Sequence, residues 1–195
     1  MNKIEHLKTI IDYENSEKRV EESKYFTEEI LDFFEIKKYR ELFKEYQQIT
    51  FVEETFCKLG EKKDKEKDSF IWFLTLDNKS VEEGLNVLMD IDEMRSSDIK
   101  EEEKGKDYDP YFLTNNSIPI SVNENVSYIF LSKTNKKVLK FYAYDDTWDW
   151  QVLANNFDEF IDRLYVIEPE KEELTEEKKK KISKIVDNIL KMIKK

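Results

Sequence analysis

The fold class can be inferred from residues 117–165, which read SIPISVNENVSYIFLSKTNKKVLKFYAYDDTWDWQVLANNFDEFIDRLY. This stretch opens with three short runs that are rich in β-branched and aromatic residues and are separated by polar turns, a pattern that predicts a β meander. These runs are 117–122, 126–132 and 137–145. The segment after residue 154 predicts a helix, because Asn155 or Asn156 can cap it and its apolar residues recur at helical spacing. A meander followed by a helix is typical of an α+β chain.

The chain before the meander shows mostly helical spacing. The pattern predicts a short helix over 4–11 and a helical region over 17–48 with a break near Ile36. Thr27 is a suitable N-cap inside that region, because its hydroxyl can accept a hydrogen bond from the first helical turn. A capping box formed by Ser80 and Glu83 indicates a further helix.

Between these helices the sequence favours strands and loops. SFIWFLTL (69–76) predicts a buried strand, because it is short, apolar and rich in aromatic residues. The run 49–59 fits a strand or a helix equally well. Residues 60–68 contain no apolar side chain, and residues 95–110 are strongly polar, so both predict exposed loops.

Residues 168–195 follow the meander and its helix and predict one more helix, after Pro169 and with Thr175 as the cap. Its apolar residues fall at spacings of three and four: Ile182, Ile185, Val186, Ile189, Leu190 and Ile193. We therefore divide the chain into an α+β domain, 1–167, and an amphipathic helix, 168–195, that packs on the domain or on a partner. The lysines at 178–181 leave a membrane surface or a partner groove as alternatives.

Charge sets the class of partner. The 195 residues carry a net charge of −11. Nine lysines against seven acids give 168–195 a charge of +2, which leaves −13 on the first 167 residues. Nucleic-acid binders need cations for phosphate contacts, so this balance argues against nucleic acid and favours a basic protein partner.

The residue types needed for common catalytic sites are scarce. The chain has one histidine, His6, and one cysteine, Cys57, so it has no internal disulfide and little scope for histidine or zinc chemistry. Its three glycines are too far apart for a phosphate-binding loop. The sequence therefore predicts a protein that is not an enzyme and holds neither cofactor nor metal. The N-terminus lacks an apolar signal core and no apolar run could span a bilayer, so we expect a cytoplasmic protein without membrane contact.

Partner binding is the function we assign to two polar segments that contain aromatic residues. Tryptophan beside aspartate combines an apolar anchor with a charge that steers basic partners, and aromatic residues are common binding hot spots. The candidate residues are Asp145, Asp146, Trp148, Asp149 and Trp150 in DDTWDW, with Asp107, Tyr108 and Asp109 in the long polar loop. Two alternatives stay open: the tryptophans are core residues at a strand end, or the cluster of Asp145, Asp146 and Asp149 binds Mg²⁺ in a hydrolase.

The stretch 118–165 resembles the SUKH superfamily, which includes bacterial toxin-immunity proteins and fungal regulators of cell-wall synthesis. The resemblance rests on the "IPI" strand, the following strand pair, a variable loop with tryptophan, and a closing helix of the "SFxEFL" type. Here these segments read IPIS (118–121), SYIFLS (127–132), KVLKFYAYD (137–145), DTWDW (146–150) and ANNFDEFIDRLY (154–165). EIKKYRELFKEY (35–46) is similar to an earlier family helix, with Tyr39 and Phe43 in place, although the family's Leu-Pro, Asn-Gly-Gly and Gly-Gly-Asp elements are absent.

The resemblance implies an antiparallel sheet of four to six strands flanked by helices, without catalytic residues. It also implies an immunity protein that binds and neutralises a cognate bacterial toxin, with nucleases among the candidates. A scaffold or regulatory binding module without a toxin partner is the first alternative, and the metal-dependent hydrolase is the second. We expect a monomer or a weak homodimer.

Overall fold

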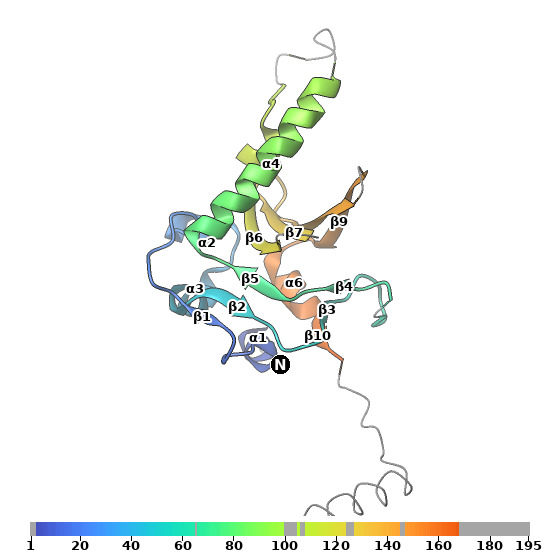
Figure 1. The fold of residues 1–195 in the computed structure, drawn as a ribbon. Helices are drawn as coiled ribbons and strands as arrows, with labels where there is room; N and C mark the ends of the chain where they lie inside the picture. Colours follow the sequence, from blue (N-terminus) through green and yellow to red (C-terminus); the bar gives the residue numbers. More distant parts are fainter. Residues whose placement is uncertain are drawn as a thin grey trace, which may run out of the picture.

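The structure is a computed structural model that describes residues 3–64, 66–99, 105, 108–123, 127–144 and 147–167. Within these residues the fold is α+β, as predicted, with one four-stranded sheet and two three-stranded sheets (Figure 1). Every strand pair is antiparallel. The predicted helix at 168–195 lies outside the described residues, so the division at residue 167 stays a prediction.

The predicted meander forms the four-stranded sheet in the order β6-β7-β8-β9. Its strands are β6 (Ser117–Asn123), β7 (Ser127–Ser132), β8 (Val138–Tyr144) and β9 (Thr147–Ala154). The turn between β7 and β8 places Lys136 at a φ of 60°, and Asn135 accepts a hydrogen bond from the backbone N–H of Lys137 through its side chain. β9 is a full edge strand, where the family resemblance had implied a variable loop and the end of a strand was only an alternative.

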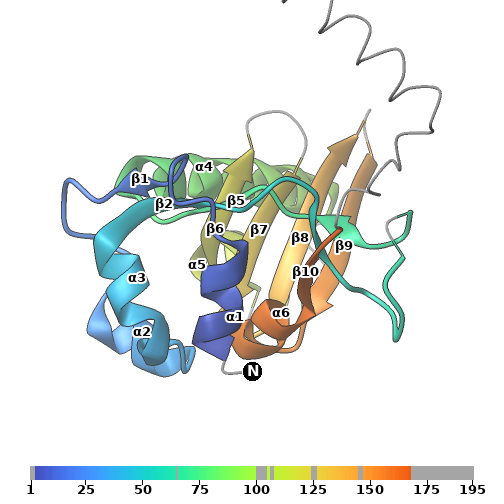
Figure 2. The ribbon, with the colours of Figure 1, turned by 90° about the horizontal axis from the view of Figure 1, so that it is seen from below.

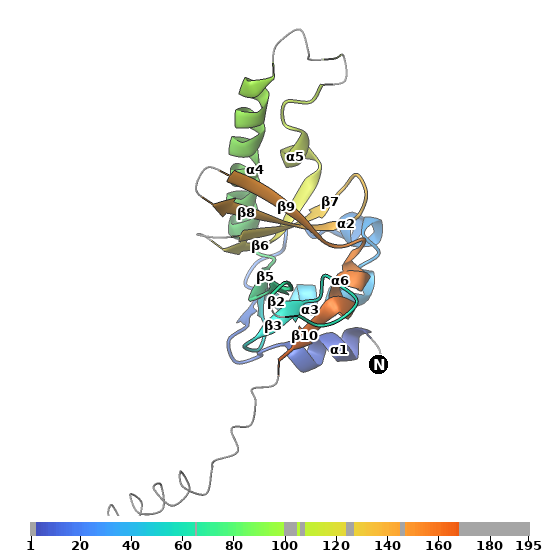
Figure 3. The same ribbon diagram turned by 90° about the vertical axis from the view of Figure 1, so that its right-hand side faces the viewer.

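The two faces of this sheet have different neighbours. Ile129 and Leu131 of β7 point into the main core, which also contains Val138 and Leu153. Phe130, between them, points to the opposite side, because successive side chains of a strand alternate. There it packs with Phe141 of β8 and with Leu88 and Ile91. Figure 3 shows α4 and α5 on this second side of the sheet and the smaller sheets on the other.

The other layer contains two small sheets and most of the short helices. One sheet has the order β1 (Glu17–Lys18), β2 (Tyr46–Thr50), β5 (Phe73–Thr75), and the other β10 (Leu164–Val166), β3 (Thr55–Cys57), β4 (Ser69–Phe70). The helices are α1 (Lys3–Ile10), α2 (Glu28–Phe33), the 3-10 turn η1 (Lys37–Tyr39), α3 (Arg40–Glu45) and α6 (Phe157–Arg163). Figure 2 shows α1 beside α6, the helix that closes the family-like stretch. Asn156 caps α6 by accepting a hydrogen bond from the N–H of Glu159.

The prediction of one helical region over 17–48 was wrong at both ends. Glu17 and Lys18 form a strand that pairs with Gln48 and Tyr46, so pairing within the sheet overrides helical spacing there. The expected break is confirmed, because the chain leaves α2 through Glu35 at a φ of 60° before η1 begins.

The strand predicted at 69–76 forms, but it changes sheets in the middle. β4 pairs with β3 and β5 pairs with β2. Ile71 and Leu74 are buried, while Phe70 and Trp72 are 45% and 58% exposed. The prediction of a buried strand is therefore wrong for these two aromatic residues. The neighbouring run 49–59, which the sequence left open, contributes to β2 and forms β3.

α4 (Asn78–Asp98) is the longest described helix, and α5 (Phe112–Asn115) lies against it. Asp77, and not the predicted capping box, caps α4 by accepting from the N–H of Ser80. α4 also continues to Asp98, into a segment predicted as loop. Among the described residues, no helix combines the length and the apolar character needed to cross a bilayer.

Candidate protein-binding surface

α4 covers only one half of the outer sheet face, the face that carries Phe130. It crosses closest at Gly84, where a Cβ atom would lie 2.7 Å from Cβ of Pro119 and 3.0 Å from Cγ2 of Val122. Both are residues of β6, so only a glycine allows this close approach. The half of the face formed by β8 and β9 lies beyond α4 (Figure 1).

We call this uncovered half the open sheet face and define it by Tyr128, Leu139, Trp150 and Val152, with the buried Phe141 between Tyr128 and Trp150. The pairing register places Tyr128, Phe141 and Trp150 in one row across the strands. Leu139 and Val152 form the next row. Trp150 and Val152 are 37% and 48% exposed, although both are large and apolar.

Trp150 combines a fixed position with an exposed surface. Its ring centroid lies 4.8 Å from that of Phe141 and 6.1 Å from that of Phe130, and both phenylalanines are fully buried. Such contacts hold the indole in place at no further conformational cost on binding. Trp150 thus packs on buried aromatic residues, as the core alternative expected, and presents the rest of its ring to solvent.

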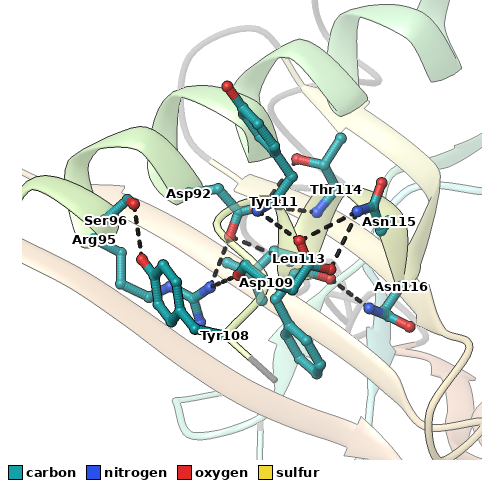
Figure 4. Close-up of polar contacts among 11 residues, drawn as sticks. Asp92, Arg95, Ser96, Tyr108, Asp109, Tyr111, Leu113, Thr114, Asn115 and Asn116 are labelled. Atoms are coloured by element: carbon teal, nitrogen blue, oxygen red, sulfur yellow. Dashed lines mark hydrogen bonds and ion pairs between the residues drawn. The ribbon is translucent and has the colours of Figure 1, made fainter. Parts of the chain in front are cut away.

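The open sheet face is bordered by α5 and the residues just before it, and one buried carboxylate holds this border to α4 (Figure 4). Asp92 of α4 is fully buried and accepts hydrogen bonds from the N–H of Leu113 at 3.2 Å and from the N–H and Oγ1 of Thr114 at 2.8 and 2.9 Å. Nη2 of Arg95 forms an ion pair with it at 3.3 Å. α5 is therefore attached to α4 through its first turn, where a carboxylate satisfies free N–H groups.

The two described residues of the predicted loop site lie on this border. The hydroxyl of Tyr108 donates to Oγ of Ser96 at 2.7 Å, or accepts from it. Asp109 accepts from the N–H of Tyr111 at 2.9 Å, and its carbonyl accepts from Nη2 of Arg95 at 3.3 Å (Figure 4). The segment is thus held against the second half of α4.

Leu113 connects the border with the open sheet face. It packs against the cluster that contains Phe130 and Phe141, on which Trp150 lies. The structure in this way brings Tyr108, Asp109 and Trp150 to one side of the molecule. Trp148 and Asp149 lie in β9 beside Trp150, and their backbones pair with Ala143 and Tyr142 of β8. Asp107, Asp145 and Asp146 lie outside the described residues.

Sequence reasoning missed Asp92, Tyr128 and Val152. Asp92 follows Leu88 by four residues, so it occupies the apolar stripe of its helix, and this position was a signal for a buried, bonded carboxylate. Tyr128 lies in a strand that was predicted, but its place beside Trp150 follows only from the register of the sheet. Val152 was missed because the sequence had not indicated β9 as a strand.

Three side chains of types that often act in catalysis are packed or hydrogen-bonded within the fold: Cys57, His6 and Lys140. Burial raises the pKa of the Cys57 thiol to about 12, so the reactive thiolate is disfavoured. A ring nitrogen of His6 lies 2.9 Å from the carbonyl oxygen of Leu164. The buried ammonium of Lys140 donates to Oγ of Ser69 and to the carbonyl of Phe70, and burial lowers its pKa to about 8. Within the described ranges no three His, Cys, Asp or Glu residues come together as a metal site.

Comparison with known proteins gives one family match, which includes most of the stretch that resembles the SUKH superfamily. The model of the SMI1 / KNR4 family (SUKH-1) matches residues 37–163, from η1 to the end of α6. The match includes α4, α5 and all four strands of the large sheet, and therefore the open sheet face. No curated protein and no solved structure matches the chain.

Proposed function

The chain belongs to the SMI1 / KNR4 family (SUKH-1), and from this premise we propose that it is a non-catalytic immunity protein that binds and neutralises a cognate bacterial toxin. The open sheet face and the Tyr108–Asp109 border form the binding surface in this proposal. We place the protein in the cytoplasm, where an immunity protein meets a toxin that has entered the cell.

The observation that carries the proposal is the exposure of Trp150 and Val152 on an ordered sheet. Large apolar side chains that gather on a rigid surface typically mark a protein interface. Tryptophan is enriched among the few residues that supply most of the binding energy. An anchor that is already held by Phe141 at 4.8 Å loses little freedom when the partner binds.

The charge of the chain supports a basic partner. A net charge of −11 attracts cations over a distance and raises the rate of encounter. Toxins that cleave nucleic acid need basic surfaces to hold their substrate. An acidic inhibitor that occupies such a surface blocks the substrate directly, and its association rate falls as salt rises.

Affinity capture at rising salt, followed by co-production, tests this function. The tagged chain is used to isolate its partner from the cells that make it, and the partner is then produced with and without the chain in a test host. We expect a stoichiometric, basic partner that arrests growth alone and is harmless beside the chain. A partner without toxicity contradicts the immunity function and favours the regulatory binding module.

Two matched tryptophan variants test the surface. Trp150→Ala should weaken the isolated complex at least tenfold, about 1.4 kcal/mol or more, as expected for an interface hot spot. Trp72→Ala removes an exposed tryptophan from another sheet and should leave the affinity within about twofold, because most interface energy is concentrated in few residues. Equal effects of the two variants would contradict the assignment of the open sheet face.

A further inference from the structure

A second aromatic surface lies on the other layer of the molecule, on β3, β4 and β5. We call it the lower aromatic patch and define it as Phe56, Phe70, Trp72 and Phe73. Successive ring centroids are 5.5, 6.5 and 6.2 Å apart, so the four rings form a continuous row. Phe70 and Trp72 are about half exposed. The row is neither part of the open sheet face nor covered by any described helix.

An acidic rim borders this patch. A hollow of about 740 Å³ is lined by Phe70, Trp72 and Phe73 together with Glu53 and Glu54. Both glutamates are exposed. The surface therefore offers apolar rings beside negative charge, which fits a segment that is apolar on one side and cationic on the other.

The chain itself leaves the described fold at this rim. β10 pairs with β3, and the N–H of Ile167, the last described residue, donates to the carbonyl of Glu54 at 3.1 Å. Residue 168 therefore starts next to the hollow. Any segment that follows is held there at a high effective concentration, which favours contact within one chain over contact between molecules.

The last 28 residues have the matching chemistry. Residues 178–195 contain eight lysines and one aspartate, and the apolar stripe defined above, Ile182 to Ile193, belongs to the same segment. The ten residues before them can span at most about 33 Å when extended, and an 18-residue helix is about 27 Å long. This reach is ample, because Trp72 and Glu54 line the same hollow.

We propose that residues 178–195 dock on the lower aromatic patch of their own chain as an amphipathic helix. The apolar stripe lies against Phe70 and Trp72, and the lysines lie toward Glu53 and Glu54. Docking removes from water both an exposed aromatic row and an apolar helix face, each of which is unfavourable alone. It leaves the open sheet face free, so it holds whether or not the proposed function does.

A spin label on the tail tests this docking in the full-length chain. Ser183→Cys places a nitroxide beside the stripe without altering it. The native Cys57 is fully buried and has a raised thiol pKa, so it does not take up the label. The chain has three tryptophans, and Trp72→Phe assigns the Trp72 indole signal in the NMR spectrum. We expect the label to remove most of the Trp72 signal and to affect the Trp150 signal much less.

Controls decide between docking within one chain and other contacts. Ile185→Asp with Ile189→Asp in the labelled protein should restore the Trp72 signal, because the stripe is then charged. A mixture of spin-labelled, isotope-free protein with isotope-labelled, spin-free protein should show no broadening. An unchanged Trp72 signal in the labelled chain overturns the proposal, and so does a stripe variant that restores nothing. Broadening in the mixture identifies a second copy as the occupant and overturns it as well.

Discussion

The buried carboxylate of Asp92 is the residue on which the border of the open sheet face depends most. Asp92→Ala removes the acceptor of three hydrogen bonds and the partner of Arg95, and it leaves the N–H groups of Leu113 and Thr114 without their acceptor. Hydrogen bonds to a charged group are worth about 1.5–3 kcal/mol each. The carboxylate had to be desolvated in the folded state, so part of that sum is returned in the variant.

The net effect on stability should be large. Removing one partner of a buried ion pair costs about 3–5 kcal/mol, so we expect a loss of about 3 kcal/mol in the free energy of unfolding. For a chain of this size that corresponds to a fall in Tm on the order of 10 °C. Asp92→Asn keeps one acceptor oxygen and should cost about half as much, because its amide group cannot accept the remaining N–H bonds.

Chemical denaturation and amide hydrogen exchange measure the two parts of this effect. Denaturation gives the loss of free energy, with Glu93→Ala as the control, since Glu93 is the exposed neighbour on α4 and should change stability by less than about 0.5 kcal/mol. Exchange should accelerate first at Leu113 and Thr114. A loss under about 1 kcal/mol for Asp92→Ala, or unchanged exchange in α5, would refute the view that Asp92 holds this segment.

Three further outcomes follow from close contacts and burial. Gly84→Ala should destabilise the fold by about 1–2 kcal/mol in denaturation, because the new Cβ meets the rigid ring of Pro119. The control Asn86→Ala, at an exposed position on the same helix, should stabilise the fold by a few tenths of a kcal/mol. A Gly84→Ala variant that is more stable than the wild type would contradict the close packing. Burial lowers the pKa of Lys140 from 10.5 to about 8, so between these pH values the unfolded chain binds a proton that the folded chain does not. In parallel denaturation series, the free energy of unfolding of the wild type should therefore rise by about 3 kcal/mol relative to Lys140→Met as the pH goes from 8 to 10.5. A difference that stays constant with pH would exclude this linkage. Asn156→Ala should lower Tm through the loss of about 1 kcal/mol of capping energy, and an unchanged melting curve would show that the cap of α6 is dispensable.

The large sheet was predictable because its strands alternate with turns whose chemistry is local. Asn135 and the lysines around it indicated the turn between β7 and β8, and the structure places a left-handed residue there. β9 was harder to predict, since Asp149 interrupts its aromatic run and its strand character comes from pairing with β8. The helical pattern before residue 27 failed for the same reason: Glu17 and Lys18 form a strand only because β2 lies beside them.

The residue types of the proposed binding surface could be chosen from the sequence, but the place of these residues in the fold could not. Trp150 and Asp109 were chosen because aromatic and acidic side chains together favour an interface, and the structure puts Asp109 beside α4 and Trp150 on the outer sheet face. No pattern in the sequence indicates that α4 covers one half of the outer sheet face and leaves the other half open. That outcome depends on the approach of Gly84 to Pro119, a contact between residues 35 positions apart.

The alternation of side chains in β7, β8 and β9 separates the residues of the core from those of the proposed binding surface within the same strands. Ile129, Leu131 and Leu153 point into the main core and hold the sheet to the lower layer. Trp150 and Val152 point to the opposite side and contribute to a surface that costs the fold some exposed apolar area. A one-residue slip in register would exchange these two sets of side chains. The hydrogen-bonded register of the strands therefore also determines which side chains form the proposed binding surface. If the open sheet face binds the partner as proposed, substitutions on the outer rows change the partner while the core rows keep the fold.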